Sequence, residues 1–453
     1  MRSVNPATGE TIQSYEKMDK PLLDEIVQDA SLAQERWRDR SYHDRASLLR
    51  NAAKLLEERK SDYAELMARE MGKPLPQGES ESEKCAWVCN YYVEKAEQFL
   101  EEEVIDSDAS KSYVTYNPLG TVLAIMPWNF PFWQLFRFGA PALMAGNAVV
   151  LKHAPNVTGC ALAIEELMHE AGIPEELFRT VIADVEQTQE LITHPEIAAV
   201  TLTGSTRAGK AVASKAGSVL KKTVLELGGS DPYIILEDAE VEAAAETCVT
   251  SRLINSGQSC IAAKRFIVVE ENYDTFLDAV TDLMKKQQVG SPFDSSTDIG
   301  PMAREDLRDQ LHEQVRQSVE AGAKCVLGGK LPDRKGAFYP PTILTEVEKG
   351  MPAYEEELFG PVASILKVKD EQEAIEVAND TDYGLGAAVF SRDEERAERI
   401  AAEELRAGCC FVNEFVKSDP RLPFGGIKQS GFGRELSHHG IKEFVNVKTV
   451  YRS

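Results

Sequence analysis

The chain has 453 residues, of which 43% are hydrophobic and 8% aromatic, and its formal net charge is −24. This length predicts about three structural units with cores large enough to be stable without disulfides. The negative charge disfavours nucleic acid and anionic membrane surfaces as partners. No run of about 18 apolar residues could span a bilayer. We therefore expect no nucleic-acid partner and no membrane partner.

The cysteines and the first residues bear on the compartment. The first ten residues contain no apolar core, so we expect no signal peptide. Eight cysteines without the spacing of a small disulfide-rich domain indicate free thiols in a reducing compartment, the cytoplasm. Neither Cys85 and Cys89 nor the adjacent Cys409 and Cys410 have partners at zinc-like spacing. No metal is expected.

Helical spacing of apolar residues dominates the first hundred positions. Residues 21 to about 73 predict packing helices, and a further helix is expected from about 79 to 102. Residues 112–117 and 444–451 alternate in the manner of strands. Two such edge strands would promote aggregation if left unpaired, which favours a homodimer or homotetramer.

Strands and helices alternate through the rest of the chain. The expected strands are 122–126, 148–151, 178–182, 198–202, 223–227, 233–236, 266–269, 324–326, 363–368, 387–390 and 409–412. This alternation is typical of parallel sheets with helices on both faces. Such sheets bind ligands beyond the carboxyl ends of their strands, where Lys152, Gly204 and Ser205 fall.

Three side chains with complementary chemistry stand in distinctive stretches. Cys260 follows a polar run and precedes an apolar strand; a lone cysteine is more often a small buried hydrophobe. Glu226 lies between leucines, where burial lets a carboxylate exchange a proton near neutrality. Asn129 lies between prolines and aromatics as a fixed amide donor. Together they indicate acyl transfer on a thiol.

The stretch 204–211 nearly fits a phosphate-binding loop that ends in Gly-Lys-Ser/Thr. It carries Ala211 where a hydroxyl should hold Mg²⁺, and it lacks the G-x-G-x-x-G spacing. Its backbone N–H groups can still hold a pyrophosphate at a strand-to-helix turn. The residues alone leave the kind of nucleotide open.

Five blocks in order carry a family resemblance: PWNFP (127–131), LELGG (225–229), GQSC (257–260), ELFGP (357–361) and PFGGIKQSGFGRE (423–435). They resemble the signature blocks of the NAD(P)-dependent aldehyde dehydrogenase superfamily, and the similarity runs from residues 5–9 to the C-terminus. Within the superfamily the chain is most similar to the shorter bacterial succinate semialdehyde dehydrogenases, through residues 152–156 and 437–440.

The resemblance implies an α/β fold with two doubly wound parallel-sheet domains and a small β oligomerisation arm. The implied parts are a dinucleotide-binding domain (1–105 and 119–228), a catalytic domain (229–436) and oligomerisation strands (106–118 and 437–453). The implied activity is oxidation of an aldehyde to a carboxylic acid through a thiohemiacetal and a thioester on Cys260. Asn129 and the Cys260 backbone N–H would hold the oxyanion, and Glu226 would activate water.

The same resemblance implies NAD or NADP as cofactor. Its implied contacts are Lys152 with the adenosine ribose, Gly204 and Ser205 with the pyrophosphate, Glu357 with the nicotinamide ribose, Phe359 with the ring and Trp128 nearby. Many NAD-preferring relatives carry a glutamate where this chain has Pro155. Without that carboxylate a 2′-phosphate is not repelled, so the preference stays open.

Arg137 occupies the position at which semialdehyde-oxidising relatives carry an arginine for the distant carboxylate. The bland interpretation is an arginine on a helix surface. A second arginine of some relatives is Ile254 here, and Lys417, Ser418 and Arg421 are the candidate replacements. Succinate semialdehyde, or another short aldehyde with a carboxylate tail, is the expected substrate.

Two alternatives remain. A broad aliphatic or aromatic aldehyde dehydrogenase would use an apolar tunnel of Phe132, Trp133 and Phe415. A cofactor-free thiol hydrolase would use the cysteine and its oxyanion donors without a dinucleotide site.

Overall fold

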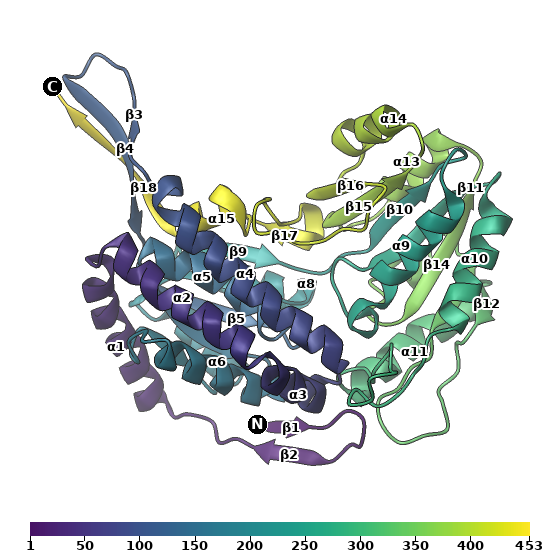
Figure 1. Cartoon of the computed structure of the whole chain (residues 1–453), viewed down its shortest axis with the longest axis horizontal. Helices are drawn as coiled ribbons and strands as arrows, with labels where there is room; N and C mark the ends of the chain where they lie inside the picture. Colours follow the sequence, from purple (N-terminus) through teal and green to yellow (C-terminus); the bar gives the residue numbers. More distant parts are fainter.

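A computed structural model describes every residue from Met1 to Ser453 and shows two α/β halves with a slender arm (Figure 1). The two halves lie side by side, and the region where they join is called the waist below (Figure 1). The arm projects from the first half (Figure 1). None of the helices is both long and apolar enough to cross a membrane. The predicted two-sheet α/β architecture is confirmed.

The first half is built on a six-stranded sheet with the order β17-β9-β8-β5-β6-β7. Its strands are β5 (Thr121–Met126), β6 (Ala148–His153), β7 (Phe178–Thr180), β8 (Ile197–Thr203), β9 (Lys222–Glu226) and β17 (Gly431–Phe432). All pair in parallel except β17, which joins the edge antiparallel to β9. The central strands are buried on both faces, as expected where apolar runs are continuous and helices cover a parallel sheet.

Helices cover this sheet on both sides (Figure 1). They are α1 (Lys20–Arg38), α2 (Tyr42–Glu58), α3 (Lys60–Met71), α4 (Leu75–Phe99), α5 (Trp133–Ala145), α6 (Thr158–Glu170), α7 (Val185–Thr193) and α8 (Thr206–Gly217). The long helix α4 packs against α2, α3 and α5, and it runs toward the second half (Figure 1). One end of α4 therefore reaches the junction between the halves.

The second half is built on a seven-stranded sheet with the order β12-β13-β14-β11-β10-β15-β16. Its strands are β10 (Asp231–Ile235), β11 (Ala263–Val269), β12 (Lys324–Leu327), β13 (Thr342–Thr345), β14 (Val362–Val368), β15 (Gly386–Phe390) and β16 (Cys409–Val412). Its helices are α9 (Val241–Leu253), α10 (Tyr273–Lys285), α11 (Glu305–Glu320), α12 (Pro352–Glu355), α13 (Glu371–Asn379) and α14 (Glu394–Arg399). Only β12 runs antiparallel to its neighbour.

The arm is a three-stranded antiparallel sheet of β3 (Glu103–Val104), β4 (Lys111–Pro118) and β18 (Val445–Arg452). The two edge strands predicted from the alternation pair with each other, from Lys111 opposite Arg452 to Pro118 opposite Val445. Strand β18 still presents one free edge. The expectation of a homodimer or homotetramer stays a prediction.

Smaller elements complete the fold. They are the hairpin β1 (Arg2–Val4) and β2 (Thr11–Ser14), helix α15 (Ser437–Lys442), and the short turns η1 (Pro155–Val157), η2 (Ile254–Gly257), η3 (Ile400–Glu404) and η4 (Lys428–Ser430).

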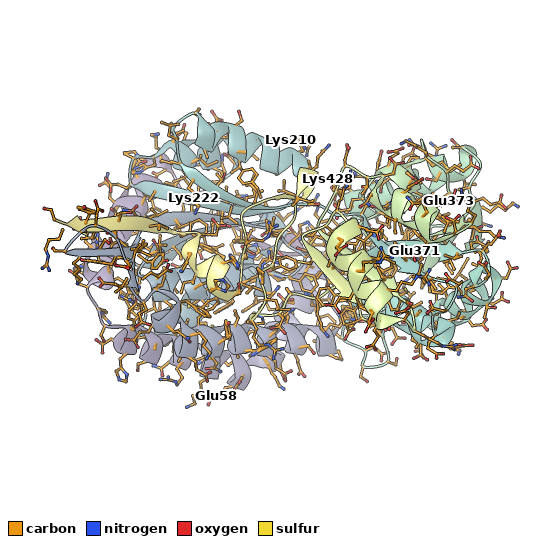
Figure 2. All side chains as sticks on the ribbon, turned by 90° about the horizontal axis from the view of Figure 1, so that it is seen from above. Glu58, Lys210, Lys222, Glu371, Glu373 and Lys428 are labelled. Atoms are coloured by element: carbon orange, nitrogen blue, oxygen red, sulfur yellow. The ribbon has the colours of Figure 1, made fainter.

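A late segment links the two halves at the waist. Lys428 donates to the backbone oxygens of Asn379 and Thr381 in the second half, and Lys210 of α8 donates to the Gln429 side chain at 3.1 Å. Seen from above, Lys210 and Lys428 lie close together at this junction, while Lys222 and Glu371 lie in opposite halves (Figure 2). Residues 428–429 thus contact both halves at their junction.

Candidate active site

Cys260 lies in a turn between η2 and β11 at the waist of the molecule. The residues just before this turn have an unusual backbone, because Asn255, Ser256 and Gly257 all adopt left-handed conformations with φ of 55°, 55° and 76°. Non-glycine residues rarely adopt this conformation unless the surroundings hold them there, and such strain is concentrated at functional sites.

Hydrogen bonds from three directions hold this turn. The Asn255 side chain donates to the backbone oxygen of Asn129 at 2.7 Å, and the Asn255 N–H donates to the Gln77 side chain at 2.7 Å. Lys264 of β11 donates to the backbone oxygen of Cys260 at 2.7 Å. The sulfur is therefore positioned by α4, the segment after β5 and β11 together.

Asn129 is buried beside this turn. Its Nδ2 donates to the backbone oxygen of Gln258 at 3.2 Å, and its Oδ1 has no hydrogen-bond partner. An amide carries two N–H donors, so one of them remains available. Asn129 and Cys260 line the same cavity, which places an amide donor near the thiol.

Glu226 ends strand β9 as a buried carboxylate, and neither of its oxygens has a hydrogen-bond partner. Burial raises the pKa of Glu226 above its usual range, and the guanidinium of Arg137 offsets part of the effect. Gly425 makes room for it, since a Cβ there would lie 2.7 Å from Glu226 Oε1. Such a carboxylate can take up and release a proton near neutral pH.

The Cys260 thiol is influenced by the same groups. Burial raises its pKa to about 12, while Arg137 and Lys264 act in the opposite direction. The negative form of Glu226 raises it further, which indicates that the two groups sense each other. Because the thiolate is the reactive form, the sulfur needs a base or a bound ligand to lose its proton at neutral pH.

Two cavities meet at Cys260, which lines both. The first has a volume of about 410 Å³ and is called the cofactor-side cavity below. Its lining includes Trp128, Asn129, Gly204, Ser205, Glu357 and Phe359. Six residues predicted from distant parts of the sequence are thus brought to one cavity.

The glycine-rich turn of the cofactor-side cavity has the predicted form. Strand β8 ends at Thr203, Gly204 and Ser205 form the turn, and α8 begins at Thr206. The Ser205 hydroxyl accepts a hydrogen bond from the Ala208 N–H at 3.3 Å and so caps the helix. The remaining free N–H groups at this helix start suit an anionic phosphate.

Glu357 and the aromatic pair lie at the other end of the cofactor-side cavity. The Gly229 N–H donates to Glu357 Oε1 at 2.9 Å, and a side chain at Gly228 would collide with the other oxygen. The rings of Trp128 and Phe359 meet edge to face, with centroids 5.7 Å apart. Glu357 can accept hydrogen bonds from ligand hydroxyls, and the two aromatic rings can pack against a flat ligand ring.

Lys152 lies at the carboxyl end of β6, opposite Ile125 of β5, and lines neither cavity. Its side chain is half-buried, and its ammonium has no hydrogen-bond or ion-pair partner in the structure. Burial lowers the pKa of Lys152. An unpaired cation at the carboxyl edge of the sheet suits an anionic or hydroxyl-rich ligand.

The second cavity, called the substrate-side cavity below, has a volume of about 390 Å³. Its apolar wall consists mainly of Phe130, Trp133, Phe415 and Phe424. Phe132 does not belong to it, because that ring is buried against Tyr63 at 4.9 Å. The apolar tunnel of the broad-specificity alternative therefore contains Phe130 where the sequence suggested Phe132.

Arg137 lines the substrate-side cavity from α5 and is only 2% exposed, so the helix-surface interpretation is wrong. Its Nε forms an ion pair with the buried Glu435, and its Nη2 lies 3.4 Å from the Thr203 hydroxyl. The guanidinium lies over the Phe424 ring at 4.6 Å. Arg137 therefore lines the cavity with a charged side chain, but that charge is already paired with Glu435.

The structure brings two of the three loop candidates to this cavity. Ser418 is buried in its wall, and Lys417 lines it but pairs with Glu414 at 2.8 Å and is 45% exposed. Arg421 does not line the cavity; it pairs with Asp419 and its side chain is 68% exposed.

Lys84 is a lining residue that the sequence argument did not single out. It comes from α4, and its ammonium donates to the Ser418 hydroxyl at 2.9 Å and lies 4.4 Å from the centre of the Trp133 ring. The signal in the sequence is weak: Lys84 follows the buried Glu81 by three residues, which places the two side chains on the same side of the helix. A charge on a buried helix face points to a partner, but it does not say which one.

Comparison with known proteins agrees with this geometry. The aldehyde dehydrogenase family model matches residues 1–450, so the chain belongs to the aldehyde dehydrogenase family. The chain is 49% identical to a probable succinate-semialdehyde dehydrogenase (NADP⁺) of Synechocystis sp., with 99% of each chain covered. It is 44% identical to a succinate semialdehyde dehydrogenase (NAD(P)⁺) of Escherichia coli, covering 99% of this chain and 97% of the relative.

A solved structure of a relative has the same fold. The succinic semialdehyde dehydrogenase of Streptococcus pyogenes, solved in complex with NADP⁺, superposes with a TM-score of 0.97 at 38% identity, with 99% of each chain covered. The protein is thus an NAD(P)-dependent oxidoreductase that acts on aldehydes.

Proposed function

We propose that this enzyme oxidises succinate semialdehyde to succinate and accepts NADP. One observation carries the proposal: Cys260 stands where a cavity with a dinucleotide-type wall meets a compact cavity lined by aromatic rings and positive charges. Relatives of 44% and 49% identity that carry this activity in their names support the substrate.

Attack on the aldehyde is the first step of the proposed mechanism. The sulfur of Cys260 bonds to the carbonyl carbon as its proton leaves to a base, and the carbonyl electron pair moves onto oxygen. The free N–H of Asn129 and the backbone N–H of Cys260 would hold that oxygen. Because burial raises the pKa of the thiol, we assign the proton to Glu226 in its ionised form or to water.

Hydride loss then converts the thiohemiacetal on Cys260 into a thioester. A bound NAD(P) supplies the hydride acceptor. We propose that Gly204 and Ser205 hold its pyrophosphate, that Lys152 and Glu357 bond its two riboses, and that Trp128 and Phe359 border its ring. The free N–H groups at the α8 start and the carboxylate of Glu357 fit these tasks.

Hydrolysis of the thioester is the last step. Glu226 removes a proton from water as the water oxygen bonds to the acyl carbon, and the Cys260 sulfur leaves as the acid is released. The raised pKa of Glu226 suits this role, since a base that is too acidic would take the proton poorly.

Charge in the substrate-side cavity supports a carboxylate-bearing aldehyde. We propose that Arg137 and Ser418 face the tail of the substrate, with Lys417 near the mouth. Arg421 is left out because its side chain is exposed and paired with Asp419. A net charge of −24 opposes long-range capture of an anion, so a local positive wall is needed.

Acceptance of NADP rests on an absent carboxylate. Pro155 begins η1 just after β6 and is exposed, so this position carries no negative charge of its own toward a 2′-phosphate. Lys152 lies nearby on β6 and can contribute positive charge. A cytoplasmic location and a homodimer or homotetramer remain predictions.

The test compares succinate semialdehyde with butanal, an uncharged aldehyde of equal length, each with NADP and with NAD. Formation of reduced cofactor is followed by absorbance. We expect kcat/KM for succinate semialdehyde to exceed that for butanal by at least about tenfold, because a hydrogen bond to a charged group is worth about 1.5–3 kcal/mol. Equal values for the two aldehydes would show a broad-specificity aldehyde dehydrogenase instead.

A further inference from the structure

One charged side chain of the substrate-side cavity has no oppositely charged partner. Besides the Cys260 thiol, four residues with normally charged side chains line its wall: Glu81, Lys84, Arg137 and Lys417. Three of these have an oppositely charged partner, in the pairs Glu81–Lys73, Arg137–Glu435 and Lys417–Glu414. Lys84 forms no ion pair in the structure, and its only hydrogen bond goes to the Ser418 hydroxyl.

Asp419, an acid outside the cavity that acts on Lys84, is already paired with another residue. Asp419 follows Ser418, but its carboxylate accepts two hydrogen bonds from the guanidinium of Arg421, at 2.6 and 2.9 Å. The Lys84 ammonium instead lies over the Trp133 ring, 4.4 Å from its centre. Ring contact stabilises a cation only partly, because it replaces little of the lost hydration.

Lys84 is partly buried, and a partly buried ammonium without an ion-pair partner is unfavourable unless a ligand supplies the charge. We propose that Lys84, together with the Ser418 hydroxyl, anchors the distal carboxylate of the substrate and sets the preference for charged aldehydes. This inference rests on the proposed function and names the group that makes it selective. Arg137 contributes less net charge, since Glu435 already neutralises it.

The same arrangement disfavours uncharged aldehydes. A neutral tail would leave the ammonium unpaired and would exclude water from it, which penalises the wrong substrate as well as favouring the right one. The aromatic wall then orients the carbon chain toward Cys260, which lines the same cavity. Selectivity thus comes from a residue of α4, outside the signature blocks.

The preference should depend on pH. Burial lowers the pKa of Lys84 to about 8, and the charge of Arg137 acts in the same direction, whereas Glu81 and Asp419 oppose it. Lys84 is charged below this pKa and loses its charge as the pH rises through it. The advantage of succinate semialdehyde over butanal should therefore fall above about pH 8, and the ratio of the two kcat/KM values cancels ionisations that both substrates share.

The test measures that ratio from pH 6.5 to 10 for wild type, Lys84→Met, Lys84→Arg and the control Lys95→Met. Lys95 lies on the same helix but is exposed. We expect Lys84→Met to lower the ratio by about 10- to 100-fold, mainly through KM for succinate semialdehyde. Lys84→Arg should retain much of the preference and keep it to higher pH, because arginine stays charged.

The outcomes distinguish a failure of the role assigned to Lys84 from a failure of the proposed substrate. A wild-type preference that survives unchanged in Lys84→Met would overturn the inference and leave the proposed function standing. Equal losses with both aldehydes would show that Lys84 only supports the fold. No wild-type preference at all would overturn the proposed substrate and this inference together. If Lys84→Met fails to fold, the pH profile of Lys84→Arg decides, and a profile that matches wild type would contradict the assignment.

Discussion

The two cavities that meet at Cys260 are built by different means. The cofactor-side cavity depends largely on the main chain, through the turn at Gly204 and Ser205 and the close approach at Gly228. The substrate-side cavity is lined by charged and polar side chains that three separate elements bring together: Lys84 from α4, Arg137 from α5 and Ser418 from the loop after β16. Main-chain recognition is encoded in short contiguous motifs, whereas charge placement depends on long-range packing.

Removal of the Cys260 sulfur should have the largest effect, because it should abolish aldehyde oxidation but leave cofactor binding intact. Cys260→Ala is expected to lower aldehyde oxidation by at least about 10⁴-fold, because the covalent intermediates cannot form. Binding of NADPH, followed by its fluorescence, should change little, since the rest of the cofactor-side wall is intact. Residual oxidation near the wild-type rate, or loss of NADPH binding, would contradict the assigned role of Cys260.

The next largest effect concerns the stability of the substrate-side wall. Arg137→Ala leaves the buried Glu435 without its partner, and breaking a buried pair costs about 3–5 kcal/mol. Urea unfolding should show this loss in the free energy of unfolding. Adding Glu435→Gln to the variant should restore part of it, because the unpaired charge is removed. An unchanged unfolding midpoint in Arg137→Ala would show that the ion pair does not support the fold.

A smaller effect is expected on the cofactor side. Pro155→Glu introduces a carboxylate at the exposed start of η1, where it would repel a 2′-phosphate. We expect kcat/KM with NADP to fall relative to NAD by about tenfold, the equivalent of about 1.4 kcal/mol of repulsion. The neutral variant Pro155→Gln serves as the control. A ratio that does not change in Pro155→Glu would place the 2′-phosphate elsewhere.

The same contrast explains what could be predicted from the sequence. Most of the buried strands were predictable because their apolar runs are continuous. Cys260, Glu226 and Asn129 could be proposed as site residues because each lies in a distinctive local stretch. Strand β13 was missed because only four residues follow two prolines there. Lys84 was missed because its contact with Ser418 links residues 334 positions apart, which no local pattern reveals.

The pairing within the arm could not be predicted for a related reason. Alternation correctly predicted strands near β4 and β18, but alternation does not identify a partner. In the structure the two strands pair with each other although one covers residues 111–118 and the other residues 445–452. The free edge of β18 is the part of the arm to which the oligomer prediction now applies.

The most direct test of the account is a search for the covalent intermediate in Glu226→Gln. The variant is mixed with succinate semialdehyde and NADP, quenched after the first turnover, and the peptide that contains Cys260 is analysed by mass spectrometry. We predict one equivalent of reduced cofactor and a succinyl group on Cys260, because water can still take the thiol proton, so that attack and hydride loss proceed while hydrolysis is slowed by about 10²–10⁴-fold. Steady turnover without an adduct, or an adduct on another residue, would contradict it.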